Sequence, residues 1–160
     1  MCGFCVLVGE RPDNATDLER VLASRGPDGR GEASAHGCWL LHRRLAVIDP
    51  TEHSAQPFVL DGENAVVAFN GEIYNYRAVR QRLGGIFATD GDTEVFSRVL
   101  SGEAALADLR GMYAGVLVAP GGIRLARDRF GIKPLYRTTA ASGGLAVGSQ
   151  LRCLAELVPT

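Results

Sequence analysis

A cysteine directly follows the initiator methionine, in the segment Met1-Cys2-Gly3-Phe4. Methionine aminopeptidases remove Met1 readily when the next side chain is small, so we expect the mature chain to begin at Cys2. That residue would then carry a thiol and a free α-amino group, which ordinarily titrate near ~8.5 and ~7.7–8.0. A nucleophile activated by its own terminal amine is a recognised catalytic arrangement. A Met-Cys start is common by chance, and it indicates catalysis only together with the segments downstream.

Five further segments place polar side chains beside glycine or proline. They are R-G-P-D-G at 25–29, H-R-R-L at 42–45, N-G-E-I-Y-N at 70–75, G-D-T-E at 91–94 and R-D-R-F-G-I-K-P-L-Y at 127–136. Each has an ordinary structural explanation when taken singly. Asn70-Gly71 after an apolar strand is most often a hairpin turn. Gly91-Asp92 before a helix usually caps it, with Asp92 accepting backbone N–H bonds.

The cysteines do not form a recognisable metal or redox motif. Cys2 and Cys5 have the C-x-x-C spacing, but a structural zinc site needs a second pair, and Cys38 and Cys153 stand alone. A redox pair normally opens a helix, whereas this segment has the pattern of a strand. Period-two alternation would point Cys2 and Phe4 to one side and Cys5 to the other. We therefore expect no metal ion and no cofactor.

Length and charge exclude several classes of protein. At 160 residues the chain is long enough for a single domain with a real core, which we expect to span 1–160. A net charge of −1 gives no reason to expect nucleic acid or an anionic membrane as a partner. No stretch approaches the ~20 apolar residues that span a bilayer, and the N-terminus is not a signal peptide. We expect a cytoplasmic protein.

The elements that must position these residues come in blocks. Strands are expected at 5–9, 38–41, 45–48, 65–69, 112–119, 123–127, 135–138 and 145–148. Helices are expected after a capping box at Thr16-x-x-Glu19, from Tyr76 to Leu83, at 93–100 and at 104–109. Asn70 and Gly71 then fall in a loop at 70–75. Strands followed by helices and again by strands predict an α+β fold with largely antiparallel sheets.

Together with Cys2, the order and spacing of the five segments resemble the glutaminase domain of class II glutamine amidotransferases, most closely that of asparagine synthetase. The resemblance runs from Met1 to about Gly148. It implies the Ntn-hydrolase fold, a four-layer αββα sandwich in which two mainly antiparallel sheets pack face to face between helices. It also implies hydrolysis of L-glutamine to glutamate and ammonia through a thioester.

The resemblance assigns the chemical step to three residues. Cys2 would attack the side-chain amide carbonyl of glutamine while its α-amine moves protons. The side-chain amide of Asn70 and the backbone N–H of Gly71 would form the oxyanion hole. Glycine suits that position because its backbone approaches the substrate without a Cβ in the way.

The resemblance also assigns recognition of the amino-acid part of the substrate. Arg44 would hold the α-carboxylate with its planar fork, and Asp92 with Glu72 would hold the α-ammonium group. Val47 would contribute only a backbone contact. Arg25 belongs to a loop that is expected near the nucleophile.

The ammonia acceptor is expected on another protein. Asparagine synthetases continue into an ATP-pyrophosphatase domain with an S-G-G-x-D-S loop. Ser142-Gly143-Gly144 matches only the start of that loop, because Ala146-Val147 replace the Asp and Ser, and a turn is expected there. No phosphate-binding P-loop is present. We expect a free-standing glutaminase subunit that serves a separate ATP-dependent synthetase-type protein, with residues 127–136 and 151–157 as candidate contacts.

Three alternatives remain open at this point. The chain could be a non-catalytic scaffold, an Ntn amidase that acts on another small amide, or a fragment of a longer asparagine synthetase. Ser149-Gln150 departs from the S-E of the family pattern. This change bears on the interface with the partner rather than on the hydrolytic pocket.

Overall fold

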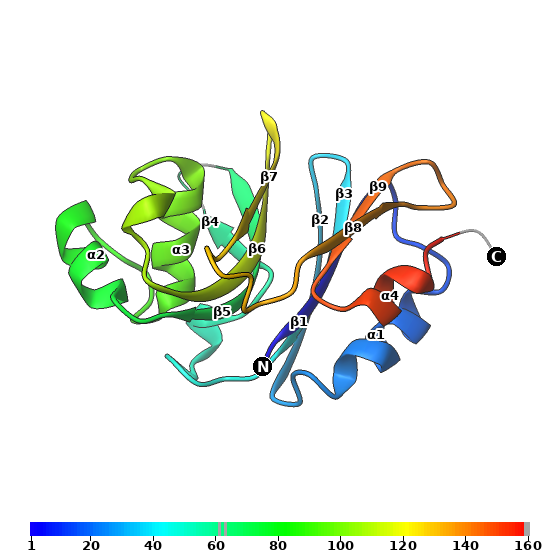
Figure 1. Ribbon diagram of the computed structural model, residues 1–160, viewed down its shortest axis with the longest axis horizontal. Helices are drawn as coiled ribbons and strands as arrows, with labels where there is room; N and C mark the ends of the chain where they lie inside the picture. The colour runs from blue at the N-terminus through cyan, green and yellow to red at the C-terminus, as the bar shows by residue number, and fades with distance from the viewer. Residues whose placement is uncertain (61, 63, 159–160) are drawn as a thin grey trace.

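The computed structural model describes residues 1–60, 62 and 64–158 and places two sheets face to face between two pairs of helices (Figure 1). On one side lie α2 (Tyr76–Leu83) and α3 (Asp92–Ser101), and on the other α1 (Ala15–Ala23) and α4 (Leu151–Ala155). Two short 3-10 turns, η1 (Glu52–Ser54) and η3 (Leu106–Asp108), lie in the connections. This is the four-layer α+β sandwich that the sequence predicts.

All strand pairs are antiparallel. The five-stranded sheet next to α1 and α4 has the spatial order β2 (Gly29–Ala35), β3 (Cys38–Arg44), β1 (Gly3–Val8), β9 (Leu145–Gly148) and β8 (Tyr136–Thr139). The four-stranded sheet next to α2 and α3 has the order β4 (Phe58–Leu60), β5 (Ala65–Ile73), β6 (Gly111–Ala119) and β7 (Gly122–Arg127).

Period-two alternation along the strands explains why there are three buried layers. On β1, Phe4 and Val6 belong to the apolar cluster between the two sheets, whereas Cys5 and Leu7 belong to the cluster under α1 and α4. The predicted separation of Phe4 from Cys5 is therefore confirmed.

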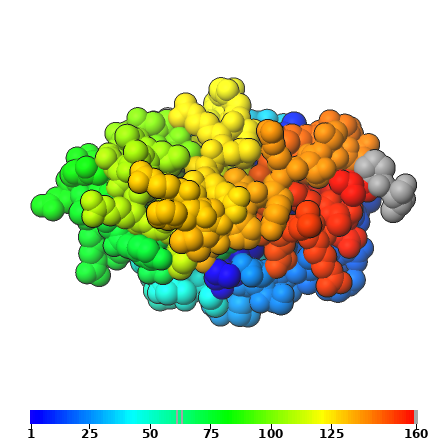
Figure 2. Space-filling model, in the orientation of Figure 1, coloured from blue at the N-terminus to red at the C-terminus, as the bar shows by residue number. Residues whose placement is uncertain are grey.

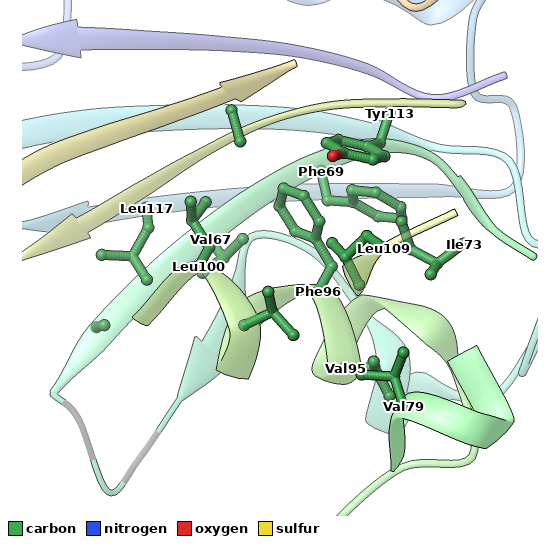
Figure 3. Packing of buried hydrophobic residues seen from close by; sticks show 13 residues of the cluster. Val67, Phe69, Ile73, Val79, Val95, Phe96, Leu100, Leu109, Tyr113 and Leu117 are labelled. Carbon is green, nitrogen blue, oxygen red and sulfur yellow. The ribbon is translucent and has the colours of Figure 1, made fainter. Parts of the chain in front are cut away.

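The third cluster lies between α2, α3 and the four-stranded sheet (Figure 3). Phe96 of α3 stacks on Phe69 of β5 with ring centroids 4.6 Å apart, and Tyr113 of β6 lies 5.6 Å from Phe96. Each such aromatic pair contributes about 0.5–1.5 kcal/mol beyond its buried area. This packing anchors β5, which carries Asn70 on its opposite face.

Two segments of the site differ from the sequence prediction. Residues 45–48 are not a strand but an irregular segment that follows the end of β3. Conversely, Asn70 and Gly71 are not in a loop, because β5 continues through them to Ile73 in register with β6. Residues 45–48 are all apolar, and a short apolar run by itself does not distinguish a strand from an irregular segment.

Smaller differences have local causes. Strand β2 was not expected, because its sequence GRGEASA is small and polar, and β4 is only three residues long. Helix α1 begins at Ala15 without a side-chain cap, so the predicted capping box at Thr16 is wrong. The expected helix at 104–109 is the 3-10 turn η3. Within the described residues, no helix is long and apolar enough to cross a membrane.

Candidate active site

A pocket opens where β1 begins and β3 ends, at one end of the space between the two sheets. Seven of the eight residues singled out in the sequence line it: Cys2, Arg44, Val47, Asn70, Gly71, Glu72 and Asp92. The pocket encloses about 590 Å³ when its open mouth is included. Figure 2 shows the N-terminal end of the chain, in dark blue, reaching the surface between segments that are distant in sequence.

The strand geometry explains why these residues meet. On β3, Cys38 and Leu40 face the other sheet, and the same alternation places Arg44 on that face. On β5, Val66 and Ala68 face the other sheet, and alternation places Asn70 there too. The antiparallel register of β1 with β3 brings the residue before Gly3 next to the end of β3.

The Cys2 thiol is held by the backbone that follows β3. Its Sγ accepts a hydrogen bond from the Leu45 N–H at 3.4 Å and lies 3.7 Å from the Leu45 carbonyl. Burial raises the pKa of the Cys2 thiol, and the Leu45 hydrogen bond and the Arg44 charge oppose that rise only in part. The thiol is therefore protonated near neutral pH, and attack on a carbonyl requires a base that removes its proton.

Beyond the end of β4, the backbone groups along this edge of β5 have no neighbouring strand within the described residues, and N–H and carbonyl groups there form hydrogen bonds with side chains instead. The Phe69 N–H donates to Gln56 Oε1 at 2.7 Å, the Phe69 carbonyl accepts from His42 Nε2 at 3.0 Å, and the Ile73 N–H donates to Asp92 Oδ2 at 2.9 Å. Alternate residues of a strand direct their N–H groups to the same edge. The Gly71 N–H therefore points to this edge, into the pocket.

His42 is a neutral side chain that contacts this edge of β5. It is fully buried, and burial lowers its pKa to about 4. Because Nε2 carries the proton that it donates to the Phe69 carbonyl, His42 links the two sheets directly before Asn70. It is a structural contact and does not line the pocket.

Asn70 carries a buried donor that the folded protein does not use. Its side chain is 1% exposed, and within the described part of the chain Nδ2 has no hydrogen-bond partner. Leaving a buried N–H without a partner costs about 1–3 kcal/mol, so such groups are rare and call for an explanation. An amide donor beside a thiol, together with the Gly71 N–H, can receive the negative oxygen of a tetrahedral intermediate.

Packing against the neighbouring strand also calls for a glycine at position 71. A Cβ at this position would lie 2.2 Å from the Met112 carbonyl oxygen and 2.7 Å from the Tyr113 Cα. The crowding comes from the neighbouring strand β6 and not from the pocket. Glycine thus allows β5 and β6 to pair closely at the point where the edge N–H is needed.

Arg44 is buried, and its guanidinium holds the following loop in place. It donates to the Thr51 carbonyl at 2.8 Å and to the Asp49 carbonyl. These contacts use two of its five donors, and among the described residues no other hydrogen bond of this side chain occurs.

Two carboxylates, of Asp92 and Glu72, line the same pocket as this cation. Gly91 is the N-cap of α3 and Asp92 is the first residue of the helix. The Asp92 carboxylate accepts a backbone hydrogen bond, from the Ile73 N–H. Asp92 is 5% exposed, and burial, with a smaller contribution from the Glu72 charge, raises its pKa to about 6. No ion pair of Asp92 occurs among the residues that the structure describes, so this buried carboxylate is a suitable partner for an ammonium group.

Lys133 lines the same pocket and was not singled out in the sequence as a site residue. It is 3% exposed, and within residues 1–60, 62 and 64–158 no carboxylate lies within ion-pair distance of its ammonium group, which contacts the Met1 sulfur. Burial and the Arg25 charge lower its pKa, whereas the Cys2 and Glu72 charges oppose that shift. The attraction between the Lys133 ammonium group and the Cys2 thiolate acts on both groups, so a charged Lys133 also favours the thiolate form of Cys2.

The loop that presents Lys133 is organised around one carboxylate. Asp128 accepts hydrogen bonds from the backbone N–H groups of Tyr113, Phe130, Ile132 and Lys133, at 2.9–3.2 Å. These bonds lower the pKa of Asp128, although burial opposes them. The R-D-R-F-G-I-K-P motif could have suggested a rigid loop, but not that its lysine enters the pocket.

Arg25 is the one predicted site residue that does not line the pocket. It lies beside the backbone of Gly3, where a Cβ would approach the Arg25 Cβ to 3.0 Å. Its side chain borders a separate hollow together with Tyr136 and Leu151. Its Nε is buried without a partner among the described residues.

No group of three or more His, Cys, Asp or Glu side chains that could hold a metal ion occurs in the part of the chain that the structure describes. The pocket instead offers a thiol, neutral donors and charges of both signs. That set fits a zwitterionic substrate with a carbonyl group at some distance from its charges.

Comparisons with known proteins agree with this geometry. A family model described as a glutamine amidotransferase domain matches residues 1–159. The chain is 34% identical to asparagine synthetase [glutamine-hydrolyzing] 3 of Arabidopsis thaliana, over 98% of this chain and 29% of the relative. It is also 34% identical to an asparagine synthetase of Zea mays, over 98% of this chain and 28% of the relative. The chain thus spans less than a third of the length of these relatives.

Among solved structures, the glutamine phosphoribosylpyrophosphate amidotransferase of B. subtilis superimposes with a TM-score of 0.78 at 19% identity. The superposition covers 97% of this chain and 43% of that one. At this level of identity the likeness shows that the two chains share a fold.

Proposed function

The chain belongs to the class II glutamine amidotransferase family, in the branch of the asparagine synthetase glutaminase domains, and from this premise we propose that it hydrolyses L-glutamine with Cys2 as the nucleophile. The observation that carries the proposal is that Asn70, whose buried Nδ2 has no hydrogen-bond partner among the described residues, lines the same pocket as Cys2. A donor held ready for an oxyanion explains a buried polar group that folding leaves unsatisfied.

In the first half of the reaction, the Cys2 α-amine, freed by removal of Met1, takes the thiol proton. The sulfur then attacks the side-chain amide carbon of glutamine, and the carbonyl oxygen becomes an oxyanion that accepts from Asn70 Nδ2 and the Gly71 N–H. Collapse of this intermediate breaks the C–N bond. The α-ammonium group returns its proton to the leaving nitrogen, so that ammonia departs and a thioester remains.

In the second half, the α-amine takes a proton from a water molecule, which attacks the thioester carbon. The same two donors stabilise the second oxyanion. When the C–S bond breaks, the proton returns to sulfur and glutamate leaves. The net reaction is glutamine plus water giving glutamate plus ammonia, and no cofactor enters the balance.

We propose that the charged pocket residues recognise the zwitterionic end of glutamine. The free N–H groups of Arg44 would bind the α-carboxylate bidentately, and Asp92 with Glu72 would bind the α-ammonium group. Val47 would contribute through its backbone at the rim. Arg25 would act through the loop beside Gly3 and not by touching the substrate, because it lies outside the pocket.

The test is glutamate release from glutamine by the purified protein, with Cys2→Ala as the inactive control and intact mass to show that the chain begins at Cys2. Equal release from both proteins would mean that Cys2 is not the nucleophile. Activity on N-acylated or decarboxylated glutamine analogues equal to that on glutamine would favour an amidase for another small amide. Absence of hydrolysis despite a processed N-terminus would favour a scaffold.

We further propose that the ammonia is used by an ATP-dependent synthetase-type acceptor, since the relatives are named as glutamine-hydrolysing asparagine synthetases. In the proposed arrangement the acceptor is a separate subunit. Supplying the purified acceptor with this protein and glutamine, or with ammonium salt alone, tests both points. Product formed from ammonium but not from glutamine in the mixture would contradict the transfer.

A further inference from the structure

Asp49 lies in the loop that connects β3 to η1 and has a positive φ of 50°. Residues with a side chain rarely adopt this conformation, and Asp and Asn adopt it most readily. The backbone of Asp49 and its side chain contact different parts of the site. Its carbonyl accepts from the guanidinium of Arg44, whereas its carboxylate binds other donors.

The carboxylate of Asp49 accepts four hydrogen bonds. Oδ1 accepts from the N–H of Thr51, at 3.2 Å, and from its hydroxyl, and Oδ2 accepts from Ser54 Oγ at 2.7 Å and from the Asp90 N–H at 2.9 Å. The Thr51 and Ser54 hydroxyls, with the two backbone donors, hold the pKa of Asp49 well below its ordinary value although burial opposes them. Asp49 is therefore an anion throughout the range in which enzymes work.

The bond from the Asp90 N–H joins two segments that are far apart in the sequence. Asp90 directly precedes Gly91 and Asp92, where α3 begins. The approach is close, because a Cβ at Gly91 would lie 3.0 Å from Ser54 Oγ and 3.4 Å from the Asp49 Cβ. Asp49 thus connects the loop that Arg44 holds to the turn that carries Asp92.

We propose that Asp49 is a positioning residue that sets the separation between Arg44 and Asp92, and thereby the recognition of the α-carboxylate and α-ammonium groups of glutamine. The inference rests on the proposed function. Those two substrate groups are attached to one carbon atom, so the cation and the anion that bind them must be held at matching positions. A displacement of about 1 Å is enough to weaken such a site considerably.

The decisive variant is Asp49→Asn. Asn adopts a positive φ as readily as Asp, so the backbone is preserved while the charge and part of the acceptor set are lost. The Kd for glutamine, measured by calorimetry on proteins that also carry Cys2→Ala, should rise about 10-fold or more, as expected for loss of one or two hydrogen bonds to a charged group. In the proteins with Cys2 intact, KM should rise similarly while kcat changes less than about threefold.

A second readout separates positioning from general damage. Iodoacetamide does not bind to the head-group charges, and Arg44 keeps its own charge and its bond to the Thr51 carbonyl in Asp49→Asn. The rate of Cys2 alkylation should therefore change far less than the Kd for glutamine. The matched control is Glu52→Gln, which removes a charge from the same region at an exposed side chain that makes no hydrogen bond among the described residues. It should leave Kd and KM unchanged.

A milder pair of variants guards against failure to fold. Thr51→Val removes the hydroxyl that donates to Asp49 while keeping the shape of the side chain, and Thr51→Ser keeps the hydroxyl. Kd should rise several-fold in the first variant and remain near the wild-type value in the second.

The outcomes are distinct. Unchanged Kd and KM in a folded Asp49→Asn protein, with normal binding by the wild type, would overturn the role of Asp49 and leave the proposed function intact. A parallel loss of kcat and of alkylation rate would also overturn it, because Asp49 would then act on the nucleophile. If the Cys2→Ala protein binds no glutamine, the proposed function fails and this inference fails with it.

Discussion

Asn70 and Cys2 line one pocket although Asn70 lies in the four-stranded sheet and Cys2 directly precedes the first strand of the five-stranded sheet. Cys2 is held by the Leu45 backbone at the end of β3, and Asn70 is held on β5 by the His42 and Gln56 contacts to Phe69. Packing of the two sheets therefore sets the relation between nucleophile and oxyanion donor. The effect of each site residue on the free energy of unfolding can be measured separately from its effect on the rate of glutamine hydrolysis.

Asn70→Ala should lower kcat for glutamine hydrolysis about 100-fold or more, with little change in KM, because the donor acts on the oxyanion and not on the bound substrate. The free energy of unfolding should fall by no more than about 1 kcal/mol, since Nδ2 makes no hydrogen bond to any residue that the structure describes. Steady-state kinetics test the expected fall in kcat, and urea unfolding tests the expected change in the free energy of unfolding. A large loss of stability with normal kcat would contradict the assignment.

Asp92→Asn should stabilise the protein at pH 7 and impair glutamine binding. The folded-state pKa of Asp92 is raised to about 6 from 3.8, so between those values the folded state binds more protons than the unfolded state. The stability contribution of Asp92 is then most favourable below about pH 4 and is lost as pH rises through 6. The variant should exceed the wild type by about 1–3 kcal/mol at pH 7.

The measurement for Asp92 is urea unfolding of both proteins at pH 7 and at pH 4, where the difference should shrink. KM for glutamine in the wild type should also rise as pH falls below about 6, since protonation removes the charge that binds the α-ammonium group. A difference in stability that is independent of pH would show that the buried charge is not its cause.

Lys133→Met should slow alkylation of Cys2 by iodoacetamide and shift its pH midpoint upward. A buried cation in the same pocket favours the thiolate, so removing it should raise the thiol pKa. Lys133→Arg keeps the charge and should retain most of the wild-type behaviour. Because Lys133 contacts Met1 in the structure, intact mass must show equal N-terminal processing in all three proteins. An unchanged midpoint in the Met variant would rule out this electrostatic effect.

Gly71→Ala should destabilise the protein by about 1–3 kcal/mol or more, because its Cβ would lie 2.2 Å from the backbone oxygen of Met112. For a chain of this size that loss corresponds to a fall in Tm of roughly 2–4 °C per kcal/mol. Gly121→Ala is the control, since nothing lies within 4 Å of a Cβ there and its φ is not positive. A thermal scan of both variants is sufficient, and equal Tm values would refute the crowding.

The local elements could be predicted in large part from the sequence because each leaves a periodic pattern. The helices beginning at Tyr76 and near Thr93 and the strands on either side of Pro120 are present, and the α+β class follows from their order. Strand β2 escaped prediction because it is small and polar, and the loop at 45–48 was taken for a strand because its residues are apolar. The pattern of apolar residues in a sequence is related to secondary structure only indirectly, through the burial of side chains.

By itself the sequence determined the identity of the reactive groups: a thiol beside the chain terminus, an Asn-Gly pair, and charges of both signs in recognisable segments. Only the tertiary structure decided which of these share a pocket. It left Arg25 outside, brought Lys133 in, left Asn70 Nδ2 without a partner and linked Arg44 to Asp92 through Asp49. Those relations depend on how two sheets pack and where β4 ends, and such long-range geometry leaves no periodic trace in a single chain.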